Sequence, residues 1–232
     1  GEKAVRRLGA RKVESCQVPI IYDPRVSGGL VGHFAGAISG AAVARGTSFL
    51  KDSLDTQLFA KGIQITDDPL KKRGRGSKPF DGEGVRTEAL TLIDDGRLTT
   101  WLLDTSTGKQ LGLASNGRAG RGTGGSPSPS TTNLTLEAGS LSQEELMADI
   151  TSGFYVTEMI GMGVNGVTGD YSRGASGFWI ENGKLTFPVS EITIAGNLKD
   201  MFANLTPAND LEFKAATNAP SVRIDGMTLA GT

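Results

Sequence analysis

Short apolar runs separated by glycine-rich turns dominate the second half of the chain. Phe154–Val156 and Phe178–Ile180 are rich in residues that fit a pleated, half-buried surface, which predicts strands. The run Phe178–Ile180 is joined to the extended run Leu185–Ile194 by Asn182-Gly183. Asn-Gly between two apolar runs is the strongest short-range signal of a β-hairpin, because both residues tolerate a positive φ. The pattern therefore predicts a hairpin with its tip at Asn182-Gly183.

A second hairpin is predicted from Glu88–Ile93 and Leu98–Leu103, which flank the turn Asp94-Asp95-Gly96. In the first hairpin Pro188 cannot donate a ladder hydrogen bond, so its strand should lie at an edge or be bulged there. The other predicted strands are short: Gln17–Tyr22, Gly62–Thr66, Thr132–Leu136, Leu211–Phe213 and Val222–Ile224. Three short helices are also predicted: Glu2–Leu8, Ser142–Ser152 and Leu198–Leu205. Ser142 is the predicted N-cap of the second, with Glu144 and Glu145 favourably placed in its first turn.

One longer stretch, Ser27–Arg45, has the helical period, with Ser27 as its N-cap. Its apolar residues recur at spacings of three and four: Leu30, Phe34, Ile38 and Ala41. Most of the other positions are Gly or Ala, and each Gly in a helix costs up to about 1 kcal/mol relative to Ala. We therefore expect neighbours to pack closely against this helix, so that Gly36 tolerates no larger side chain.

The order of these elements predicts an α+β fold with a mostly antiparallel β-sheet and a few helices. Connections of two or three residues are too short for parallel crossovers. The chain has 232 residues and no clear linker, so we expect one domain over residues 1–232.

Composition excludes several classes of protein. The net charge of −1 gives no bulk attraction to nucleic acid or to an anionic membrane. The one cysteine, Cys16, excludes an internal disulfide and suits a reducing cytoplasm. No apolar run approaches the roughly 18 residues that a membrane-spanning helix needs.

The stretch GVNGVTGDYSRGASGFWIENG, followed by PVSEITIAGNLKDMF, resembles the C-terminal region of the PmbA/TldD family, and the PmbA (TldE) branch more than the TldD branch. The resemblance extends over nearly the whole chain. It implies the C-terminal fold of that family, and a place for this chain in the second half of a longer protein.

The resemblance also bears on metal chemistry, because the TldD branch binds zinc through a His-Glu-x-x-x-His helix and a later Cys. Zinc needs such imidazole and thiolate donors. Aligned through Gly46-Thr47-Ser48, the three helix positions hold Val31, Gly32 and Gly36 here, and the region near Ala216–Asn218 has no Cys. The resemblance therefore implies no catalytic or metal-binding residue and no cofactor in this chain, with zinc in a TldD-like partner. The one histidine, His33, is interpreted as structural.

Four residues are candidates for binding a peptide. Arg118 and Arg121 lie in the glycine-rich loop Gly117–Ser130, where their guanidinium groups could hold a peptide carboxylate, although a mobile surface loop is the alternative. Asp170 and Arg173, with Tyr171 between them, lie in a second predicted glycine-rich loop and either pair with one another or face a peptide groove. The basic stretch Lys71–Lys78 is interpreted as a solvated loop, because a nucleic-acid patch would need interleaved aromatic residues.

The resemblance implies a cytoplasmic, non-catalytic subunit of a TldD/TldE-type zinc metalloprotease that degrades or matures unfolded peptides, as in peptide-antibiotic maturation and antitoxin turnover. Its partners would be a TldD-like protein and an unfolded peptide, or a second copy of itself when isolated, with no direct contact to nucleic acid or membrane. The alternative is a stand-alone adaptor protein that modulates DNA gyrase. A hydrolase with a different site is a third hypothesis.

Overall fold

The computed structural model describes residues 1–231, and only the backbone of Lys3. Residues group into two compact units. The first contains Gly1–Gly28, Ala138–Glu212 and the residues from Ala219 onward, and the second contains Gly29–Glu137 and Phe213–Asn218. Each unit is assembled from separate segments, so no single linker divides the chain, in agreement with the sequence. The single domain expected over residues 1–232 stays a prediction.

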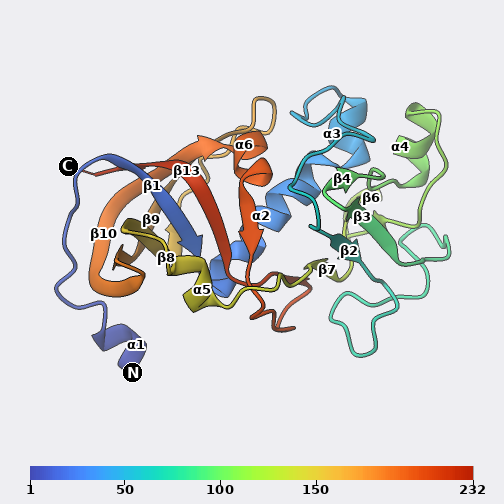
Figure 1. Cartoon of the computed structure of the whole chain (residues 1–232). Coiled ribbons are helices and arrows are strands. Elements are labelled where there is room, and N and C mark those ends of the chain that lie inside the picture. The colour runs from blue at the N-terminus through green and yellow to red at the C-terminus, as the bar shows by residue number, and fades with distance from the viewer. Residues whose placement is uncertain (232) are drawn as a thin grey trace. The chain divides into compact units, whose positions relative to one another are not determined.

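The first unit contains a ring of strands, each of which is labelled in Figure 1. The order is β1 (Cys16–Tyr22), β8 (Ser152–Ile160), β9 (Asp170–Glu181), β10 (Lys184–Asn197) and β13 (Val222–Ala230). Because β1 also pairs with β13, the five strands close on themselves. A short strand, β11 (Leu205–Pro207), pairs with β13 as well. The pair of β1 and β8 is parallel, and the other pairs in the ring are antiparallel.

The predicted hairpin between β9 and β10 is confirmed, with φ of 48° at Asn182 and 76° at Gly183. The pairing register between β9 and β10 shifts both before Pro188 and after Val189. Since β10 pairs with both β9 and β13, Pro188 lies beside a bulge rather than on an edge strand. Strands β8 and β9 are longer than predicted, so Asp170 and Arg173 belong to β9 and not to a loop.

Three short helices complete the first unit: α1 (Glu2–Val5), α5 (Gln143–Met147) and α6 (Leu198–Ala203). The predicted N-cap of α5 is confirmed, because Ser142 Oγ accepts a hydrogen bond from the Glu145 amide at 3.1 Å. Glu145 in turn accepts from the Ser142 amide at 2.7 Å, which completes a capping box. All three helices are shorter than the sequence pattern suggests.

The second unit contains a five-stranded sheet in the order β12 (Thr217–Asn218), β7 (Leu134–Leu136), β2 (Ile65–Asp67), β3 (Leu90–Asp94) and β4 (Arg97–Leu98). The predicted turn between β3 and β4 is confirmed, with positive φ at Asp95 and Gly96. β4 ends after two residues, and Asp104 begins a helix that the pattern did not show, α4 (Thr105–Gln110). The predicted strand Leu211–Phe213 is not a strand. The α+β class with mostly antiparallel pairing is confirmed.

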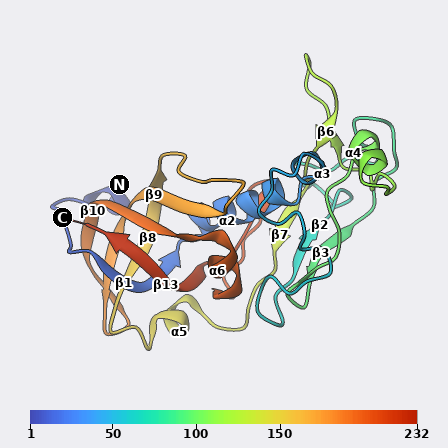
Figure 2. The ribbon, with the colours of Figure 1, turned by 90° about the horizontal axis from the view of Figure 1, so that it is seen from above.

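A two-stranded ribbon, β5 (Ala119–Gly120) with β6 (Ser128–Pro129), lies inside the stretch predicted to be one long loop. Figure 2 shows its connecting segment extending away from the rest of the second unit. None of the described helices is long and apolar enough to cross a membrane.

The predicted long helix Ser27–Arg45 is two helices, α2 (Pro24–Ala37) and α3 (Gly40–Ala44). α2 begins earlier because Pro24 suits the first helical position, where its missing N–H is not needed. The chain becomes extended at Ser39, which has ψ of 124° and separates the two helices. The predicted apolar face is confirmed at Leu30, Phe34 and Ile38, all of which are buried.

The expectation that Gly36 tolerates no side chain is wrong. Gly36 is exposed, and a Cβ added there would have no neighbour within 4 Å. The close approach occurs instead at Gly40, where a Cβ would lie 2.7 Å from Thr107 Oγ1 and 2.9 Å from the Leu102 carbonyl oxygen. The glycine-rich sequence of this region therefore does not show which glycine is closely packed against a neighbouring segment.

Candidate functional site

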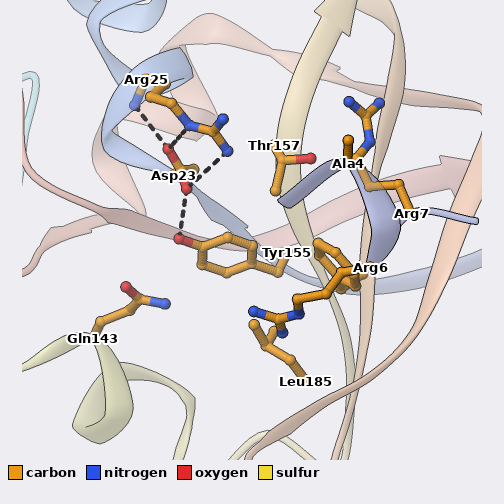
Figure 3. A pocket seen from close by; sticks show the side chains of 10 residues that line it. Ala4, Arg6, Arg7, Asp23, Arg25, Gln143, Tyr155, Thr157 and Leu185 are labelled. Atoms are coloured by element: carbon orange, nitrogen blue, oxygen red, sulfur yellow. Dashed lines mark hydrogen bonds and ion pairs between the residues drawn. The ribbon is translucent and has the colours of Figure 1, made fainter. Parts of the chain in front are cut away.

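A cavity of about 280 Å³ in the first unit is the candidate functional site. Figure 3 shows that its lining comes from α1 and the residues after it, the start of α2, α5, β8, β9 and β10. Its ten lining residues are Ala4, Arg6, Arg7, Asp23, Arg25, Gln143, Tyr155, Thr157, Phe178 and Leu185. None of them was singled out by the sequence. These residues come together only in the folded protein, because the segments that line the cavity with β8 and β9 are far apart in the sequence.

The floor of this cavity is apolar. Tyr155 and Phe178 are buried there, and Leu185 packs against the same hydrophobic cluster. The cluster also contains Ile21 and Ile180, so it is continuous with the core between the ring and α5. A floor of this kind can accept an apolar side chain of a ligand.

Three guanidinium groups surround the floor. Arg6 lies over the Phe178 ring, with its Cζ 5.1 Å from the ring centroid. Arg7 forms an ion pair with Glu158 on β8. Arg25 is paired with Asp23 through its Nε, at 2.8 Å. Arginines beside an apolar floor can hold a carboxylate or another anion next to an apolar side chain.

Asp23 lies between Arg25 and Tyr155 (Figure 3), and Tyr155 Oη donates to Asp23 Oδ2 at 3.1 Å. Burial disfavours the charge on Asp23, but hydrogen bonds from the side chain and amide of Arg25 outweigh it and lower the pKa of that carboxyl group. Burial, and then the charge of Asp23, raise the pKa of Tyr155. Asp23 is therefore an anion and Tyr155 a neutral hydrogen-bond donor at neutral pH.

The lowered pKa of Asp23 predicts how stability changes with pH. Its folded-state pKa lies below the ordinary 3.8, so its carboxylate contributes stability above that pH and loses it as the pH falls through the folded-state value. We expect Asp23→Asn to lower the free energy of unfolding by about 1–2 kcal/mol at neutral pH, with the difference shrinking in acid. Denaturant unfolding at several pH values measures this.

Tyr155→Phe is the companion variant, because it removes one donor and keeps the carboxylate with its Arg25 partner. It should cost less than Asp23→Asn at neutral pH. A difference between the parent and Asp23→Asn that stays the same on acidification would contradict the assignment of Asp23.

Arg118, predicted to bind peptide, is an interior residue. Its side chain and that of Asp67 are both 0% exposed, and Arg118 Nε donates to Asp67 Oδ2 at 2.6 Å. Its other donors bind backbone carbonyl oxygens of Asp67, Glu88, Asn116 and Gly117. The expectation that Arg118 and Arg121 together hold a peptide carboxylate is therefore wrong for Arg118.

Arg121 is exposed and directly follows β5, at the start of the segment that connects β5 and β6. Its position is compatible with the predicted contact to a peptide, which stays a prediction. Arg118 is thus buried and Arg121 exposed. The glycine-rich sequence around both residues did not reveal this difference.

Asp170 and Arg173 lie three residues apart on β9, so their side chains point to opposite faces of the strand. Asp170 is exposed and accepts hydrogen bonds from Thr168 Oγ1 at 2.6 Å and Asn197 Nδ2 at 3.3 Å. Arg173 is half-buried, and its positive charge partly offsets the rise that burial causes in the pKa of the buried Tyr171. Asp170 and Arg173 therefore do not pair with each other, and their role toward a peptide stays a prediction.

Residues 15–231 match the family model of the PmbA/TldA metallopeptidase C-terminal domain. The chain is 44% identical over 230 residues to the metalloprotease PmbA of Escherichia coli O157:H7. It is 42% identical over 231 residues to a PmbA homolog of Haemophilus influenzae. Each match covers 99% of this chain and 49% of the relative, so the chain spans about half the length of these relatives.

Solved structures share the fold. A candidate modulator of DNA gyrase from Bacteroides thetaiotaomicron matches with a TM-score of 0.88 and 32% identity, over 100% of this chain and 51% of that one. TldE from Thermococcus kodakarensis matches with a TM-score of 0.87, over 99% of this chain and 54% of that one. At 23% identity the latter supports the fold alone. The chain therefore belongs to the PmbA/TldD family, and its residues 15–231 form the C-terminal domain of that family.

Proposed function

We propose that this chain is part of a non-catalytic, PmbA/TldE-type subunit of a cytoplasmic metalloprotease complex. A TldD-like partner supplies the zinc site, and the complex degrades or matures unfolded peptides. The observation that carries the proposal is the set of residues on α2 where the TldD branch has its zinc motif. They are Val31, Gly32 and Gly36, none of which can bind a metal or move a proton.

The rest of the donor set does not fit zinc either. Near Ala216–Asn218, where the TldD branch has its Cys, the polar side chains are those of Thr217 and Asn218, neither of which is a thiolate donor. Asn218 Oδ1 accepts from the amides of Lys214 and Ala215 at 2.8 and 2.9 Å, so it serves the local turn. Among residues 1–231, no group of three or more His, Cys, Asp or Glu side chains is placed to hold a metal. To take part in zinc chemistry, this chain would therefore need metal-binding side chains that lie outside residues 1–231.

The cavity in the first unit supports a peptide-handling role. Its arginines and apolar floor suit the carboxylate and an apolar side chain of an extended peptide. Arg121 on the ribbon is a second candidate contact. In this proposal the chain positions the peptide, and the partner carries out hydrolysis.

The test is metal analysis combined with co-purification. After dialysis, the isolated chain should carry no stoichiometric zinc, whether it is a monomer or a homodimer, and a complex with a TldD-like chain should contain zinc and cleave an unstructured peptide. About one tightly bound zinc per isolated chain, lost in His33→Ala, would overturn the assignment. Peptide cleavage by the isolated chain would equally overturn it and favour a hydrolase with a different site.

A second candidate function is a stand-alone adaptor that modulates DNA gyrase. It is favoured only by the names of solved structures such as that from Bacteroides thetaiotaomicron. Co-purification distinguishes the two: recovery of gyrase subunits without a TldD-like chain would support the adaptor.

A further inference from the structure

A second cavity, of about 370 Å³, lies in the second unit between the loop after β2 and the turn before β12. We call it the basic hollow and define it by its five cationic side chains, Lys71, Lys72, Arg73, Arg75 and Lys214. One wall is the basic stretch that the sequence suggested was only a solvated loop. The other wall brings an aromatic residue, Phe213, to that stretch from a distant part of the chain.

The first wall is held in one conformation by a buried side chain, Asn133. Its Oδ1 accepts from the Gly76 amide at 2.9 Å, and its Nδ2 donates to the Asp68 carbonyl oxygen at 2.6 Å and to Ser77 Oγ at 2.9 Å. The loop also lies so close to the sheet that a Cβ at Gly76 would be 2.2 Å from the Thr132 carbonyl oxygen. The basic side chains therefore extend from a fixed backbone.

The second wall is held in the same way by Asn218, which is also buried. Its Oδ1 accepts from the amides of Lys214 and Ala215, and its Nδ2 donates to the Ala215 carbonyl oxygen at 2.8 Å. Asn218 lies on β12 opposite Thr135 on β7, two residues after Asn133. Asn133 directly precedes β7 and Asn218 lies on β12, so each wall is held next to one of two paired strands.

Three cationic side chains of the hollow remain available to bind an anion. Lys72, Arg73 and Arg75 are all exposed, and among residues 1–231 none of the three has an ion-pair partner. Lys71 extends across to the other wall, with its Nζ 3.0 Å from the centroid of the Phe213 ring. Lys72, Arg73 and Arg75, clustered on a backbone that Asn133 holds in place, create a positive potential that attracts an anion.

We propose that the basic hollow binds a carboxylate-rich segment of an unstructured peptide. Arginine forks bind carboxylates in a bidentate manner, and the volume suits a few acidic side chains. A nucleic-acid strand would need stacking platforms, and the aromatic residue at this hollow, Phe213, has Lys71 over its ring. The inference deepens the proposed function by naming the charge of the peptide.

The test measures fluorescence anisotropy of three labelled probes at physiological ionic strength: oligoglutamate, oligoglutamine of the same length, and single-stranded DNA. The chain should bind oligoglutamate and not oligoglutamine. The double variant Lys72→Gln with Arg75→Gln should weaken oligoglutamate binding roughly tenfold. The control, Lys51→Gln with Lys61→Gln, removes two exposed charges of the same unit outside the hollow and should leave binding unchanged. Equal melting temperatures show that all variants fold.

Three outcomes would overturn the proposal: no binding of oligoglutamate, equal weakening in the control variant, or tighter binding of DNA that is lost in the hollow variant. The last outcome would assign the hollow to nucleic acid. The assay needs no partner chain, so its result is separate from that of co-purification. If the chain binds oligoglutamate but no TldD-like chain co-purifies with it, the proposed ligand of the hollow is supported and only the proposed complex is contradicted.

Discussion

Arg118→Leu should lower the free energy of unfolding by about 3–5 kcal/mol, because it leaves a buried charge without its partner. Asp67 would remain in the interior with hydrogen bonds only from Thr132, whose amide and hydroxyl donate to it at 2.7 and 3.0 Å. The backbone carbonyl oxygen of Glu88, which accepts from Arg118 at 2.6 Å, would lose its donor as well. Denaturant unfolding followed by circular dichroism measures the loss.

The matched control is Arg121→Leu, three residues along the same segment and exposed. It should change the free energy of unfolding by no more than about 0.5 kcal/mol. Replacing both Asp67 and Arg118 with Leu should recover part of the loss, since no unpaired charge then remains. Equal effects of Arg118→Leu and Arg121→Leu would show that the ion pair does not stabilise the fold.

Gly177→Ala should also destabilise the protein strongly. A Cβ at this position of β9 would lie 1.8 Å from the Tyr155 carbonyl oxygen and 3.1 Å from Phe154 Cζ. Gly177 pairs with Val156 on one side and Val189 on the other, so the added methyl group forces β8 and β9 apart inside the ring. We expect a loss of roughly 1–3 kcal/mol, the usual cost of overpacking a core.

Gly32→Ala is the control for this prediction, because the same methyl group is added where the structure leaves room. Gly32 is exposed within α2, with no atom within 4 Å of an added Cβ. It should raise the free energy of unfolding by about 0.5–1 kcal/mol through helix propensity. Melting curves of the two variants should therefore shift in opposite directions, and a shift in the same direction would contradict the packing described at Gly177.

The features that the sequence predicted well depend on neighbouring residues. The turn at Asn182-Gly183 needs two positive φ values, and the cap of α5 needs a Ser and a Glu three residues apart. Both requirements are local, so they are visible in the sequence. The α+β class follows from many such turns, because short connections force antiparallel pairing.

The features that it missed depend on residues far apart in the chain. Arg118 is neutralised by Asp67, fifty-one residues away, and nothing near Arg118 distinguishes it from the exposed Arg121. The glycines of α2 were predicted to be tightly packed, but only the position of a neighbouring segment decides which glycine is crowded. The lining of the cavity, whose residues are spread from Ala4 to Leu185, could not be predicted for the same reason.

The closure of the ring by β1 and β13 has a consequence for how the protein acquires its structure. β1 and β13 are separated in sequence by all the other strands of the ring, so the two cannot pair until everything between them has been synthesised. Pairings across such a separation carry a large loop-closure cost and slow folding, whereas the hairpin of β9 and β10 can form locally. Until β13 arrives, β1 and β10 expose unpaired strand edges, which is the state in which a nascent chain aggregates or is bound by a chaperone.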